Sequence, residues 1–148
     1  MAPTIPSFLR WAFGSGLLLA MDLAGSRPVY ADNVVKITNY RYTNAQGKLV
    51  NIAPMDEAVT LPIVATTNDI RVTVTVTGKQ AGDTCPATLI VGGMSKPVTV
   101  NNATGGFTIT IPANTLGPNS NSVLDTPVKK ANGTLRGDDT NNIAIPPP

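Results

Sequence analysis

The stretch IRVTVTVT, residues 70–77, decides the fold, because branched apolar residues alternate in it with arginine or threonine at every step. Successive side chains of a β-strand point to opposite faces of the sheet, so this period of two predicts a strand with one buried face. The same period returns over residues 98–100 and 107–111. These three segments predict an all-β domain whose core is rich in valine and isoleucine.

Weaker strand signals lie between and around these three segments. They cover residues 34–42, 49–53, 59–64, 88–91, 123–128 and 143–145, and we predict no helix beside them. Turn-forming Gly, Asn and Asp residues separate the signals at intervals of about eight to twelve residues, which is typical of sandwiches and barrels. Roughly seven to nine strands in a domain of this length are expected to form a two-sheet β-sandwich.

Residues 1–31 have the parts of a secretory signal peptide. Arg10 precedes a short apolar run over residues 11–21, and the small residue Ala31 stands at a suitable cleavage position. Asp22 interrupts the apolar region, so an uncleaved interfacial anchor is the alternative. Cleavage after Ala31 leaves residues 32–148 as one domain with a proline-rich tail and no stable membrane span. It predicts a secreted, periplasmic or cell-surface protein.

The charges of the remaining domain are few and scattered. Residues 32–148 hold nine of the chain's eleven Lys and Arg residues and eight of its nine acids, which gives a formal net charge of +1. Lys129 and Lys130 form the only pair of adjacent cations in the sequence. Nucleic-acid binding requires a basic stripe or patch along one face, so we do not expect a nucleic-acid partner.

Catalysis is not expected either. The chain contains no histidine, which removes the usual general base and the commonest zinc ligand. Two pairs of adjacent acids, Asp56-Glu57 and Asp138-Asp139, are more typical of solvated loops than of a tuned acid and base. We therefore predict a protein that is not an enzyme and needs no cofactor.

One polar run offers a weak calcium hypothesis. Asp138, Asp139, Asn141 and Asn142 bring four oxygen-bearing side chains together in sequence after Gly137. Calcium needs six to eight oxygen ligands, and the run lacks the spaced acids and the distal glutamate of a recognised calcium loop. A polar turn is the favoured interpretation.

Cys85 is the only cysteine, so an exported form of the chain has no internal disulfide. It lies in a turn-like setting between Asp83 and Pro86. The favoured interpretation is a partly buried small apolar side chain, and an intermolecular disulfide is the alternative.

A family resemblance rests on residues 69–117. Asp69 to Thr77, Ala87 to Gly93 and the segment from Val98 to Ala113 follow one another here, with Gly105-Gly106-Phe107 opening a Thr-Ile alternation that ends at Pro112-Ala113. This segment resembles the bacterial immunoglobulin-like (Ig-like) repeats of surface adhesins and secreted modular proteins. The resemblance implies an Ig-like β-sandwich and a role in adhesion or scaffolding. Such repeats usually occur in tandem, whereas this chain has one copy and its own signal, which suggests a free-standing subunit or a binding protein.

Two classes of function follow. The first is a non-catalytic structural or adhesive subunit of an extracellular or cell-surface assembly, whose partners are copies of itself or other surface proteins. The second is a soluble secreted or periplasmic module that binds carbohydrate or protein ligands. Tyr40 and Tyr42 share a strand face and form the only candidate aromatic platform for a sugar.

The strand predicted over residues 34–42 is a candidate for assembly by strand addition. It follows the cleavage site directly, so its free end can leave its own sheet and pair with a neighbouring subunit. Val35, Ile37, Tyr40 and Tyr42 are its candidate contact residues. The alternative, which we favour, is that the strand pairs within its own sandwich.

Overall fold

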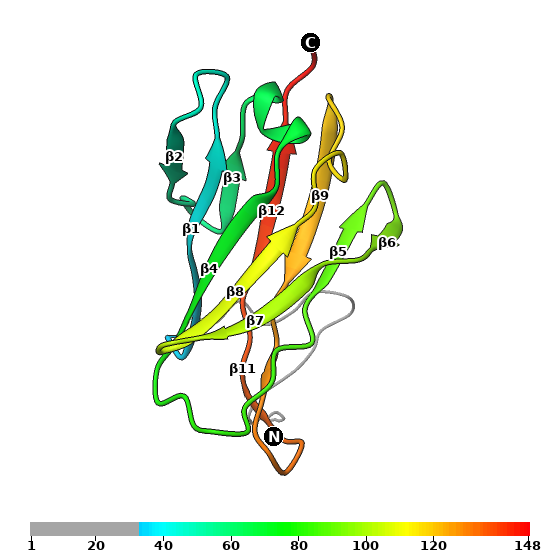
Figure 1. Ribbon diagram of the computed structural model, residues 1–148. Helices are drawn as coiled ribbons and strands as arrows, with labels where there is room; N and C mark the ends of the chain where they lie inside the picture. The colour runs from blue at the N-terminus through cyan, green and yellow to red at the C-terminus, as the bar shows by residue number, and fades with distance from the viewer. Residues whose placement is uncertain (1–32) are drawn as a thin grey trace. The chain divides into compact units, whose positions relative to one another are not determined.

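The structure, a computed structural model, describes residues 33–148, and the fold is all-β as predicted (Figure 1). One sheet, here called sheet A, has five strands. Their order is β2 (Leu49–Ile52), β1 (Val35–Thr43), β4 (Ile70–Val76), β8 (Gly106–Ile111) and β7 (Thr99–Ala103). All neighbouring strands of sheet A are antiparallel.

The second five-stranded sheet, sheet B, lies against the first. Its order is β3 (Ala58–Thr60), β12 (Thr140–Ile145), β9 (Ser120–Asp125), β5 (Thr88–Val91) and β6 (Met94–Lys96). The pairing of β3 with β12 is parallel, and the other pairings in sheet B are antiparallel. A separate hairpin joins β10 (Val128–Lys129) to β11 (Leu135–Gly137).

The core fills the space between the two sheets. In β4 every apolar residue is buried and every polar one is exposed, which confirms the alternation predicted over residues 70–77. Sheet B contributes Leu89, Leu124 and Ile143, all of them fully buried. Burial of a side chain of this size contributes about 1.5–3 kcal/mol, so the facing rows of the two sheets hold the domain together.

A β-bulge changes the phase of β1. Ile37 stands opposite Val74 and Asn39 opposite Thr73, so Thr38 is one extra residue in β1. A bulge of one residue exchanges the faces of everything that follows it in the strand. It brings Tyr40 to the same buried face as Ile37, although the two residues are an odd number of positions apart.

β4 and β8 approach closely at Gly106, which stands opposite Thr75. A Cβ atom on Gly106 would lie 2.9 Å from the carbonyl carbon of Val74, closer still to its oxygen, and 3.1 Å from the Cα of Thr75. Atoms of neighbouring backbones cannot turn aside as a flexible side chain can. Glycine is therefore required here for contact between strands rather than for an unusual φ.

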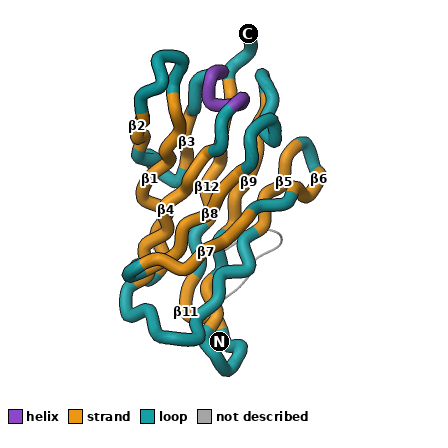
Figure 2. The backbone as a smooth tube through the Cα atoms, in the orientation of Figure 1, coloured by secondary structure: helices purple, strands orange, loops and turns teal. Residues whose placement is uncertain are grey.

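Two expectations were wrong in detail. The predicted strand over residues 59–64 ends early, because a 3₁₀ helix (Ile63–Thr67) follows Pro62 there; Figure 2 shows this helix in purple. The described residues contain twelve strands rather than seven to nine. The strands that we missed, β6, β10 and β11, have only two or three residues each, too few to show a period.

Candidate functional site

The predicted signal peptide, residues 1–31, lies outside the described residues. Over residues 33–148 the structure contains no helix that is long and apolar enough to cross a membrane. Every other candidate site from the sequence can be placed in the fold.

The polar run predicted as a turn leads into β12 instead: Asp138 and Asp139 directly precede the strand, and Asn141 and Asn142 lie in it. Asp139 and Asn141 are buried, whereas Asn142 is exposed, because the alternation of β12 extends back to Asp139. The Asp139 carboxylate accepts hydrogen bonds from the backbone N–H of Ile37, at 2.8 Å, and from that of Thr140, at 3.0 Å. The Asn141 amide donates to the hydroxyl of Tyr40 at 3.2 Å.

The bonds to Ile37 and Tyr40 connect β12 and the residue before it to β1 of sheet A across the core. They also weaken the calcium hypothesis, because backbone N–H groups already engage both carboxylate oxygens of Asp139. Among residues 33–148 no group of three or more acids, cysteines or histidines is placed to hold a metal ion. The bonding of Asp139 and Asn141 across the core could not be predicted from the sequence, because no pattern shows that the inward alternation of Ile143 and Ile145 extends back to Asp139.

The four candidate residues of the assembly strand all face the core of their own domain. Val35, Ile37, Tyr40 and Tyr42 are at most 5% exposed. β1 pairs with β4 along its length and with β2 along its second half. The described chain therefore has the pairing within its own sheet that we favoured from the sequence.

The same burial rules out the aromatic platform. A sugar stacks on an exposed ring face, and Tyr40 is 0% exposed. Burial raises the pKa of the Tyr40 hydroxyl above its ordinary value. Tyr40 and Tyr42 are therefore core residues, and the interpretation as a binding surface was wrong.

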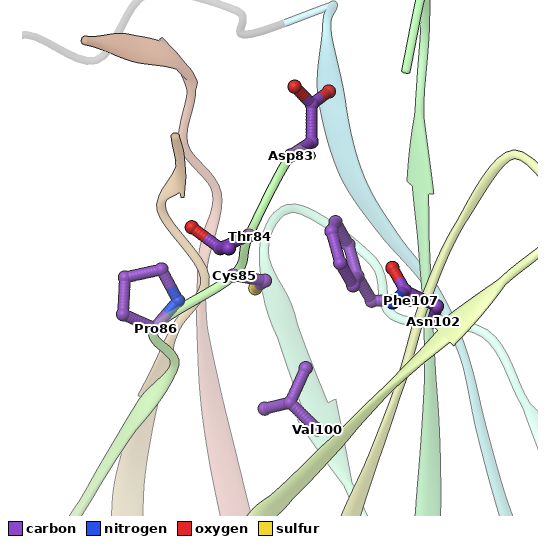
Figure 3. A pocket seen from close by; sticks show the side chains of 7 residues that line it. All are labelled: Asp83, Thr84, Cys85, Pro86, Val100, Asn102 and Phe107. Atoms are coloured by element: carbon purple, nitrogen blue, oxygen red, sulfur yellow. The ribbon is translucent and has the colours of Figure 1, made fainter. Parts of the chain in front are cut away.

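Cys85 lines a hollow of about 280 Å³ beside the β7 edge of sheet A (Figure 3). Its thiol, the ring of Phe107 and the side chain of Val100 point toward the same space, and Thr84 and Pro86 lie on the far side of the segment (Figure 3). Cys85 itself is 6% exposed and belongs to the core.

The Cys85 thiol in this hollow has low reactivity. Burial, together with the negative charges of Asp125 and Asp138, raises the pKa of the Cys85 thiol to about 12. Since the thiolate is the reactive form, the thiol is a poor nucleophile and a poor partner for disulfide exchange. The structure agrees with the favoured interpretation of Cys85 as a small buried side chain and offers no support for the intermolecular disulfide.

An ion pair closes one end of this region. Arg136 in β11 contacts the carboxylate of Asp83 twice, with Nε 2.6 Å from Oδ2 and Nη2 3.0 Å from Oδ1. The hydrogen bond from Arg136 and that from the backbone N–H of Gln80 lower the pKa of Asp83. This paired, forked geometry fastens the β10–β11 hairpin to the loop before β5.

Asp56 and Glu57, the other acidic pair, form the two central residues of a tight hairpin turn. Met55 and Ala58 exchange backbone hydrogen bonds around them, at 2.8 and 3.1 Å. Both acids have positive φ, 52° and 62°, and both are exposed. Both side chains stand on the surface, as expected for a solvated turn.

A second hollow, of about 260 Å³, was not predicted. Arg41 and Arg71 line it and stand directly opposite each other on β1 and β4. Tyr42, Thr43, Leu49, Asn68 and Asp69 complete the lining. Both arginines are visible in the sequence, but only the register after the bulge places them side by side.

Comparison with known proteins adds no relative: no family model matches the chain, and no curated protein matches it.

Proposed function

We propose that the chain is an exported, non-catalytic, Ig-like β-sandwich that serves as a structural or adhesive subunit of an extracellular or cell-surface assembly. The strand orders support the Ig-like part of this proposal. β1-β4-β8-β7 and β12-β9-β5 follow the ABED and GFC orders of such sandwiches, with β6 added beside β5.

The observation that carries the subunit role is the outer face of sheet B. Val123 on β9 and Ile90 on β5 are direct partners in the ladder, and both point outward, 37% and 36% exposed. Asn142 and Ser95 continue the same row across β12 and β6, so no charge interrupts it.

Contiguous exposed apolar side chains on a soluble domain favour contact with another protein surface. The proposed contact uses this face and leaves β1 in its own sheet. Removing β1 would take four core side chains from the sandwich and break the bonds of Asp139 and Asn141. Strand donation by β1 would therefore open the core of the donor, whereas face-to-face packing of sheet B leaves every strand in place.

The test is the mass of the secreted chain in solution, measured by sedimentation over a wide concentration range. We expect oligomers that grow with concentration, and we expect Val123→Lys to return the protein to a monomer because it places a charge in the contact. Thr73→Lys is the matched control, since Thr73 is exposed on the outer face of sheet A. Oligomers should persist in this control.

A chain that is monomeric at every concentration, or equal loss of oligomers in both variants, would contradict the proposed contact. Mass spectrometry of the same secreted sample tests export separately. The expected N-terminus is Asp32, and an intact Met1 would overturn the proposed localisation.

A further inference from the structure

The hollow lined by Arg41 and Arg71 brings two positive charges together, an arrangement that does not stabilise the fold. Like charges placed directly opposite on neighbouring strands destabilise a sheet. Arg41 and Arg71 are such a pair, and among the described residues neither has a carboxylate within ion-pair distance. Their neighbours in the same row, Asn51 and Thr110, are uncharged.

The two guanidinium groups offer a site for an oxyanion. Arginine presents its N–H donors in a planar fork that matches a carboxylate, and two arginines side by side supply opposite ends of such a site. Arg41 is half-buried and Arg71 exposed, so the pair is anchored at the sheet and open to solvent.

Two residues of the rest of the lining, Asn68 and Asp69, offer hydrogen-bond acceptors. Asp69 uses Oδ1 to accept a bond from the backbone N–H of Ala113, at 2.9 Å, which leaves Oδ2 for a ligand. The Asn68 amide donates to the carbonyl of Val64 at 2.8 Å, which leaves its own oxygen as an acceptor. A simple anion would satisfy the arginines but would meet these acceptors without a hydrogen to donate.

A ligand that fits both halves carries a carboxylate and hydroxyl groups together. Leu49 on β2, 62% exposed, adds an apolar surface for the C–H face of a sugar ring. The hollow, about 260 Å³, is smaller than the usual pocket for a drug-sized ligand, roughly 300–1,000 Å³, so it suits one sugar unit of a chain.

We propose that Arg41 and Arg71, with Asn68 and Asp69, bind the acidic sugar unit of a saccharide through its carboxylate and hydroxyl groups. This inference does not depend on self-association through sheet B. A negative result for saccharide binding would not affect the test of self-association, and a monomeric chain would not affect the test of saccharide binding.

The experiment titrates the full chain with a trimer of galacturonic acid and follows backbone amide shifts by nuclear magnetic resonance. The fully methyl-esterified trimer is the uncharged comparison, and sodium sulfate is the simple anion. We expect the acidic trimer to bind more tightly than either, with shifts centred on residues 41–43 and 68–71. Arg41→Gln and Arg71→Gln should each weaken binding by roughly tenfold or more.

Lys36→Gln is the matched control, because Lys36 lies on the outer face of the same strand but outside the hollow. It should bind the trimer as the wild type does. Either arginine substitution should also raise the melting temperature at low salt, because it removes repulsion, and high salt should reduce this gain.

Four results would overturn the proposal. The trimer and its ester could bind equally, or sulfate could bind as tightly as the trimer. A glutamate tripeptide could bind more tightly than the trimer, which would assign the site to an acidic protein segment. Absence of binding to all four probes would overturn it as well.

Discussion

Gly106→Ala is the sharpest test of the packing between β4 and β8. The added methyl group would collide with the carbonyl of Val74, so the two strands must separate by an ångström or more. Separation strains the neighbouring pairs Val74–Phe107 and Val72–Ile109, which form the centre of the core. Overpacking costs about 1–3 kcal/mol, and each buried backbone group left without a partner costs about 1–3 kcal/mol more.

We therefore expect Gly106→Ala to lower the free energy of unfolding by about 3–5 kcal/mol, a large part of a typical total of about 5–15 kcal/mol. Urea unfolding followed by circular dichroism measures this change. With an m-value of about 1–3 kcal/mol per molar urea, the midpoint should fall by roughly 2 M.

Gly117→Ala is the control, because a Cβ on Gly117 meets nothing within 4 Å. This substitution should be neutral, or stabilising by up to about 1 kcal/mol through the unfolded chain. If Gly106→Ala and Gly117→Ala had the same midpoint, the close approach of β4 and β8 would be refuted.

Three further predictions use the same assay. Val74→Asp should cost several kcal/mol because it buries an unpaired carboxylate, whereas Thr75→Asp should cost about 1 kcal/mol or less; equal losses would refute the assignment of faces. The lowered pKa of Asp83 adds stability that is present at neutral pH and is lost as the pH falls through that pKa. The difference in free energy of unfolding between the wild type and Asp83→Asn should therefore shrink in acid. A difference that stays constant with pH would contradict this prediction. Replacing Asp56 and Glu57 by Asn and Gly should raise stability by about 1 kcal/mol, because those residues tolerate positive φ; an unchanged midpoint would count against strain in this turn.

The strands with a clear period could be predicted from the sequence, and those without one could not. The sequence of residues 70–77 predicts which side chains face the core, because every second residue is a branched apolar one. The segment of β1 gave a weaker signal, and its faces depend on one extra residue, Thr38, which the local sequence pattern does not reveal. Bulges are set by the partner strand as much as by the bulged one.

The candidate sites were harder to predict because each depends on residues far apart in the chain. Asp139 was placed in a loop because acids are rarely buried, but its carboxylate satisfies the backbone of Ile37 on the other sheet. Arg41 and Arg71 are thirty positions apart in the sequence and become neighbours only through the pairing of β1 with β4. The composition excludes histidine chemistry, but it cannot predict which distant residues come into contact in the folded chain.

The bulge at Thr38 also sets a rule for any peptide that would compete for the place of β1. A regularly alternating peptide can match the buried positions of Val35 and Ile37 or those of Tyr40 and Tyr42, but it cannot match both halves at once. A competitor must carry one unpaired residue between its halves. The bulge therefore makes the place of β1 a poor match for a strand that alternates without interruption.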